Sequence, residues 1–71
     1  MHPKPPDIAE SVRAVVIASG RSVKEVADVI GVSESTARRR LKGELQFTVG
    51  EIQLLAQYLD QPVSALMGAQ S

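Results

Sequence analysis

The residues best suited to chemistry lie in one short segment. Residues 38–42 read Arg-Arg-Arg-Leu-Lys, and Glu34 and Ser35 come shortly before them. Arginine can donate two hydrogen bonds to guanine O6 and N7, small hydroxyls fit near base edges, and lysine binds phosphate as a point charge. Four bases and one acid lie in residues 33–43, whereas residues 44–71 hold three acids and no base. The neutral net charge of the chain therefore hides a basic segment suited to nucleic acid.

Groups for catalysis or metal binding are scarce. The chain has no cysteine, its single histidine is His2, and no glycine-rich phosphate loop is present. A nucleophile with an adjacent base and a thiolate metal site are both ruled out by this inventory. We therefore expect no enzyme activity, no metal, no cofactor and no small-molecule ligand.

The elements that must position the basic segment are helices. Three segments begin with a capping residue that an acid follows three positions later, which is the sequence pattern of a capping box. Apolar residues recur with helical spacing, and no period-two alternation persists, so we predict no strands. The predicted helices begin at Asp7, Ser22, Ser33, Thr48 and Pro62, and the first three end at Gly20, Gly31 and Gly43. The predicted core-facing residues are Ile8, Val12, Val15, Val16 and Ser19; Val23, Val26, Ala27 and Ile30; Ala37 and Leu41; Ile52, Leu55, Ala56 and Leu59; and Val63, Leu66 and Met67.

At 71 residues the chain has room for one domain with a largely aliphatic core. Residues 1–6 hold three prolines and are predicted to be a flexible lead-in, residues 7–67 the domain, and residues 68–71 a tail. No apolar run reaches the ~20 residues of a membrane span, and the start lacks a signal peptide, which predicts a cytoplasmic protein.

Only Gly31 and Val32 separate the second predicted helix from the cap of the third. A glycine turn this short makes two short helices cross steeply, as they do in a helix-turn-helix. Ala27, four residues before the glycine, is small enough to let the third helix pack closely on the second.

With these residues in place, the sequence resembles the Cro/repressor (Xre-like) family of DNA-binding domains over about residues 8–67. It is most similar to small repressors and Cro proteins of actinobacterial phages. The resemblance implies a compact, all-α, five-helix, lambda-repressor-like helix-turn-helix domain in a bacterial cell or the host cell of a phage, with helix 33–42 in the major groove. The features that carry the resemblance are Ala27, Gly31, Val32 and Ser33, Ser35 and Thr36, Gly43, residues 47–49, Leu59, Pro62 and Val63, and Leu66.

The predicted third helix has a core edge and a basic face. At about 100° per residue, Ala37 and Leu41 share the edge that faces the core, and the basic side chains Arg38, Arg39 and Lys42 point away from it. Glu34 has two open interpretations, because it can accept from a cytosine amino group or simply stabilise the helix start. The residues predicted to read bases, partly from the family resemblance, are Glu34, Ser35, Arg38 and Arg39.

A second group is predicted to bind phosphates, although its hydroxyls are helix caps first. Arg40 lies on the flank of the predicted helix, where its head would meet a phosphate or a carboxylate such as Glu44. A solvated helix face is the plain alternative for the whole basic run, but the helix-turn-helix register favours DNA. The residues predicted to contact phosphate are Arg21, Ser22, Lys24, Arg40, Lys42 and Thr48.

These observations predict a sequence-specific transcriptional regulator that binds double-stranded DNA, of the phage repressor or Cro type. A homodimer on an operator with two half-sites is expected, with Tyr58, Val63 and Leu66 as candidate contacts. The alternative is a helical protein-interaction module, such as an antitoxin or adaptor domain. Leu54 and Tyr58 lie off the main inward face of the fourth helix, as a partner surface or a contact with the first helix.

Overall fold

Residues 7–68, which the computed structural model describes, form five α-helices and no strand. This confirms the predicted all-α, five-helix fold. The predicted lead-in of residues 1–6 and tail residues 69–71 lie outside the described residues. Within the described part, no helix is long and apolar enough to cross a membrane. The helices are α1 (Ile8–Ala18), α2 (Val23–Ile30), α3 (Glu34–Leu41), α4 (Val49–Leu59) and α5 (Val63–Leu66).

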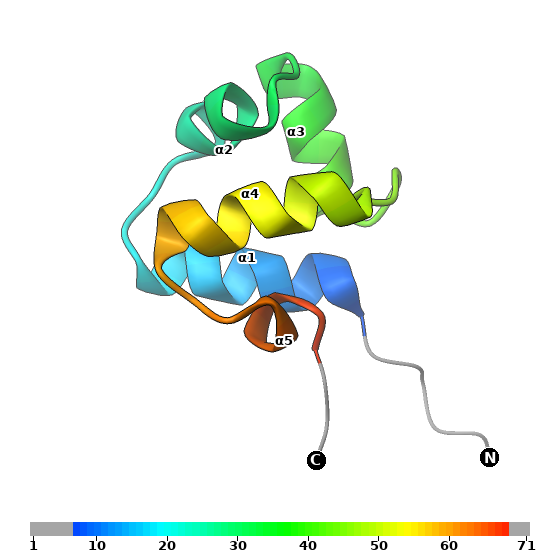
Figure 1. Ribbon diagram of the computed structural model, residues 1–71. Helices are drawn as coiled ribbons and strands as arrows, with labels where there is room; N and C mark the ends of the chain where they lie inside the picture. The colour runs from blue at the N-terminus through cyan, green and yellow to red at the C-terminus, as the bar shows by residue number, and fades with distance from the viewer. Residues whose placement is uncertain (1–6, 69–71) are drawn as a thin grey trace, which may run out of the picture.

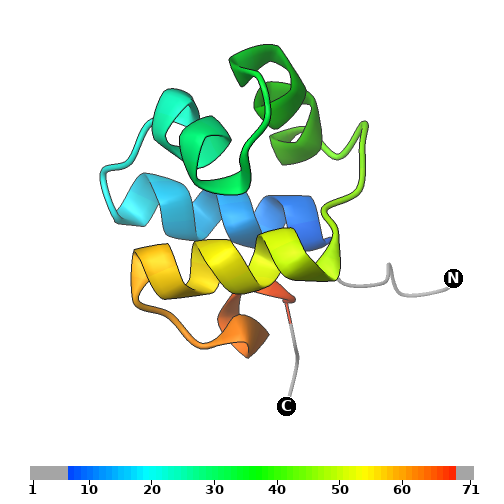
Figure 2. The ribbon, with the colours of Figure 1, turned by 45° about the horizontal axis from the view of Figure 1, so that its top comes forward.

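The helices α1 and α4 run side by side in the same direction through the middle of the domain (Figures 1 and 2). On one side of this pair lie α2 and α3, and on the other side lies α5. The helix α2 packs on α3 and α4, while α1 packs on α3 and α5. The helix α3 therefore packs against α1 and α2. It lies at the end of the domain opposite α5 (Figure 1).

The first four helices begin directly after the capping residues that the sequence analysis predicted. Ser22 accepts a hydrogen bond from the Glu25 amide at 3.2 Å, and the Glu25 carboxylate accepts one from the Ser22 amide at 2.9 Å. This reciprocal pair is a complete capping box, and Thr48 and Glu51 form a second one at the start of α4. The side chains of Asp7 and Ser33 cap α1 and α3.

The turn between α2 and α3 has the predicted geometry. Gly31 has a φ of 73°, in the left-handed region that favours glycine, and its amide donates to the Ala27 carbonyl. The Val32 amide donates to the same carbonyl at 3.0 Å. On the inner side of the crossing, Ala27 and Ala37 are both buried, at 3% and 0% exposure. Two small side chains thus allow the close approach of α2 and α3.

Most predicted core positions are confirmed, but several near helix ends are wrong. Ser19 is exposed because it is the C-cap of α1. Val63 and Met67 are 42% and 38% exposed, since α5 has a single turn and only one side of it faces inward. The inward-facing side chain of α5 is that of Leu66, which is fully buried. Leu66 is therefore not available for the dimer contact that the sequence predicted. Pro62 precedes α5 as its N-cap, with an extended ψ of 149°, so the helix begins one residue later than predicted.

Candidate nucleic-acid interface

The helix α3 has one buried edge and a broad exposed face, as predicted. Ala37 and Leu41 anchor it in the core, at 0% and 6% exposure. The helical period then directs the remaining side chains over a wide arc of solvent-facing surface. The four residues predicted to read bases, Glu34, Ser35, Arg38 and Arg39, are all exposed, as is Lys42.

Both arginines of the predicted base-reading set contact a carboxylate. Arg38 Nη2 lies 3.2 Å from Glu34 Oε2, one turn earlier on α3. Arg39 Nε donates to Glu44 Oε1 at 3.3 Å, beyond the end of the helix. All four side chains are about half exposed, so a ligand can reach them and these ion pairs are weak. Glu34 is therefore also an ion-pair partner of Arg38, at the i,i+4 spacing that we did not use in interpreting the sequence.

Arg40 points away from this face and joins α3 to α4. Its Nη1 donates to the Gln46 carbonyl and lies 3.5 Å from Glu51 Oε1. The ion pair is largely enclosed, with side-chain exposures of 18% for Arg40 and 12% for Glu51. The carboxylate that meets Arg40 is thus Glu51, not the expected Glu44. The phosphate contact predicted for Arg40 stays a prediction, and within residues 7–68 its described partners are internal.

The remaining residues predicted to bind phosphate lie at helix ends. Lys24 and Lys42 are exposed and have no ion-pair partner within the described residues. Lys42 is the C-cap of α3, next to the residues predicted to read bases, whereas Lys24 lies in the first turn of α2. Thr48 is an exposed residue, but its hydroxyl accepts from the Glu51 amide at 3.1 Å. Among the cations of residues 7–68, these two lysines are therefore the ones most readily available to a phosphate.

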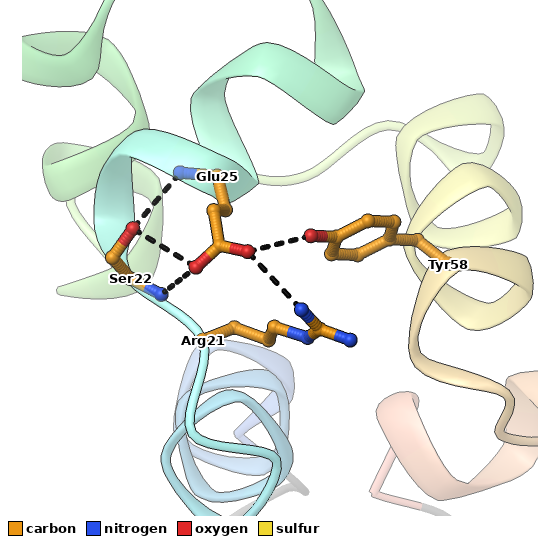
Figure 3. A network of polar contacts seen from close by, with 4 residues as sticks. All are labelled: Arg21, Ser22, Glu25 and Tyr58. Atoms are coloured by element: carbon orange, nitrogen blue, oxygen red, sulfur yellow. Dashed lines mark hydrogen bonds and ion pairs between the residues drawn. The ribbon is translucent and has the colours of Figure 1, made fainter.

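Arg21 and Ser22 belong to a polar network at the start of α2 (Figure 3). Arg21 Nη1 lies 3.3 Å from Glu25 Oε2, and Tyr58, which projects from α4, donates its hydroxyl to the same oxygen at 2.7 Å. The Arg21 guanidinium also lies over the Tyr58 ring, 5.1 Å from its centre. Tyr58 thus contacts α2 and not the expected α1, while at 37% exposure its role in a partner surface stays a prediction. Leu54 remains 47% exposed.

The charge state of this network follows from its hydrogen bonds. The pKa of Glu25 is lowered from 4.5 to about 2, first because Tyr58 donates to the carboxylate and next because the Ser22 amide does. The same hydrogen bond raises the pKa of Tyr58 above 10.0. Glu25 is therefore ionised at neutral pH and keeps its charge close to Arg21. A phosphate at this helix start competes with that carboxylate for Arg21.

Arg13 is a positioning residue that the sequence analysis missed. It projects from α1 and its Nη1 donates to the Leu41 carbonyl in the last turn of α3. The last carbonyls of a helix have no partner within the helix, and a cation there also complements the helix dipole. Arg13 therefore holds the C-terminal end of α3 against α1. No local pattern gives this contact, because the two residues are 28 positions apart.

Two short helices joined by a glycine turn, with the second helix buried along one edge and basic along the other, define a helix-turn-helix domain of the DNA-binding type. Sequence comparison agrees with this class. The chain matches the BetR domain over residues 6–71 and belongs to this family of helix-turn-helix-like DNA-binding domains. A comparison with curated proteins gave no significant match.

Proposed function

We propose that this BetR domain is a sequence-specific transcriptional regulator of the repressor or Cro type, which reads double-stranded DNA by placing α3 in the major groove. The observation that carries the proposal is the division of α3 into a buried edge and a basic face. Ala37 and Leu41 fix the helix to the core, while Arg38 and Arg39 project from it with about half of their side-chain surface exposed. Such a rigidly held arginine face suits the donor and acceptor pattern of major-groove base edges.

Different residues have different tasks in this proposal. Glu34, Ser35, Arg38 and Arg39 contact bases, and Arg39 reads guanine through its planar guanidinium. Lys42 and Lys24 contact phosphates, which fixes the position of the domain but carries no sequence information. Weaker phosphate contacts are proposed for Arg21, Ser22, Arg40 and Thr48. Each of these residues already has an internal hydrogen bond or ion pair, which it would have to break or share with the phosphate.

The neutral net charge lowers the affinity expected for non-specific DNA. Non-specific affinity comes almost entirely from neutralised phosphates, and four of the seven cations in residues 7–68 pair with a carboxylate. We also propose a homodimer on two half-sites, because one α3 reads only a few base pairs. Val63 stays a candidate contact at 42% exposure, whereas Tyr58 is already engaged with Glu25.

The proposed place of action is the cytoplasm, and the proposed activity is binding without catalysis.

Selection of bound duplexes from a random-sequence pool tests this function. The protein is expected to enrich one sequence, and its affinity for that duplex should exceed its affinity for a scrambled duplex by about 10³-fold or more. Both affinities should fall steeply as the salt concentration rises. A pool with no enriched sequence and no salt-dependent binding would instead support the alternative, a helical protein-interaction module.

A further inference from the structure

Arg39 and Glu44 meet through one particular atom of the guanidinium group. Glu44 Oε1 accepts from Arg39 Nε at 3.3 Å, which leaves both terminal nitrogens, Nη1 and Nη2, without a protein partner among residues 7–68. An arginine contacts guanine O6 and N7 with two parallel N–H groups, and the terminal pair can supply them. The Glu44 carboxylate therefore contacts the Nε edge of the Arg39 guanidinium and leaves its two terminal nitrogens available to a base.

The backbone fixes Glu44 in this position. Gly43 has a φ of 85° and its amide donates to the Arg40 carbonyl at 3.1 Å. The Glu44 amide then donates to the Arg39 carbonyl at 3.0 Å. These two bonds form a Schellman motif, which reverses the chain after α3 and places the second residue beyond the helix back over its last turn. The end of the helix thus places the backbone of Glu44 close to Arg39, and the two exposed side chains complete the contact.

The other arginines of α3 are held differently. Arg38 uses a terminal nitrogen, Nη2, to contact Glu34 Oε2 at 3.2 Å, so one arm of its fork is occupied. Arg40 uses the terminal Nη1 for Gln46 and Glu51, on the side of α3 that faces α4. Among the described residues, Arg39 is therefore the arginine of α3 whose terminal fork is both exposed and unoccupied.

We propose that Glu44 is a positioning residue for sequence reading, which holds the Arg39 guanidinium in the orientation that contacts a guanine. The inference rests on the proposed function, because it assigns a cause to the base preference of Arg39. Ordering a long side chain before binding lowers the entropy lost in the complex. The negative charge of Glu44 disfavours contact with phosphates in every complex, whereas the ordering of Arg39 favours only the specific one, so the residue raises the preference for the specific sequence.

Glu44→Gln tests this inference with two duplexes, the one recovered by selection and a scrambled version of it. The variant is expected to lose about 2- to 10-fold of its preference for the selected duplex over the scrambled one, because Arg39 is no longer held. It is expected to bind the scrambled duplex about 2- to 5-fold more tightly, because a charge that repels phosphate is gone. Asp60→Asn is the matched control, since it makes the same charge change at the end of α4, away from α3 (Figure 1). The control should leave the ratio of the two affinities unchanged.

A double mutant separates positioning from a general effect on folding or charge. If Glu44 acts through Arg39, then Glu44→Gln should no longer change the affinity ratio in an Arg39→Ala background. Equal gains in affinity for both duplexes, or an unchanged ratio in the wild-type background, would overturn the role of Glu44 and leave the proposed function standing. A wild-type protein that prefers no duplex would overturn both. Circular dichroism melting of each variant shows whether the fold is retained.

Discussion

The Tyr58 hydroxyl donates a 2.7 Å hydrogen bond to Glu25 Oε2 and thereby joins α4 to the first turn of α2. The same carboxylate completes the capping box of α2 and pairs with Arg21. One ionised group thus stabilises a helix start and a contact between two helices. Its loss would loosen the edge of the helix-turn-helix that leads into α2.

This network makes the stability of the domain sensitive to acid. The pKa of Glu25 is about 2 in the folded state and 4.5 without these contacts, so the stabilisation is complete above 4.5. It is lost as the pH falls from 4.5 towards 2, because the unfolded chain takes up the proton first. Chemical denaturation across this range should show falling stability in the wild type and a shallower fall in Tyr58→Phe. Parallel curves for the two proteins would contradict the assigned hydrogen bond.

Ala27→Leu is expected to destabilise the domain by about 1–3 kcal/mol, because a larger side chain does not fit where α2 and α3 cross. Ala27 is 3% exposed and belongs to the same buried cluster as Ala37. Thermal unfolding measures the effect. The matched control is Ala14→Leu on the exposed side of α1, which should change the stability little. Equal melting temperatures for the two variants would mean that the crossing is looser than described.

Two glycines should respond to alanine in opposite directions. Gly31→Ala is expected to destabilise by about 1–2 kcal/mol, since its φ of 73° is unfavourable for an L-residue. A Cβ there meets nothing within 4 Å, so the effect comes from the backbone alone. Gly50 lies in the first turn of α4, and Gly50→Ala should stabilise by about 0.4–1 kcal/mol. Denaturant titrations of both variants give the comparison, and a destabilised Gly50→Ala would contradict the described helix start.

Arg40→Ala is expected to destabilise by about 1–3 kcal/mol, because it leaves the enclosed Glu51 carboxylate without its cation. Arg38→Ala removes an exposed pair of similar length and should change the stability by less than about 0.5 kcal/mol. Thermal unfolding of the two variants compares the pairs directly. If Arg40→Ala were as stable as Arg38→Ala, the pair with Glu51 would be no more than a surface contact.

The sequence predicted features that depend on neighbouring residues. The caps at Ser22 and Thr48 and the turn at Gly31 are set within a few positions, so their patterns were sufficient. Contacts between distant helices were missed, because they depend on how each helix is rotated about its axis. Arg13 with Leu41 and Tyr58 with Glu25 are of this kind, at separations of 28 and 33 residues.

Two local features also escaped prediction, for physical reasons. The helix α5 has one turn, and an apolar pattern that short does not define which side faces inward, so Val63 and Met67 were wrongly assigned to the core. Arg39 and Glu44 are five residues apart, a spacing that brings no two side chains together within a helix. Their contact requires the left-handed Gly43 that reverses the chain.

Whether α3 reads base pairs is tested by comparing Arg39→Ala with Lys42→Ala. Each variant is titrated with the selected and the scrambled duplex at several salt concentrations. Arg39→Ala should weaken binding of the selected duplex by about 1–3 kcal/mol and relax the preference at one base pair. Lys42→Ala should weaken both duplexes alike and reduce the salt slope by about one unit. If Arg39→Ala instead weakened binding of both duplexes equally and kept the sequence preference, then α3 does not read bases through Arg39.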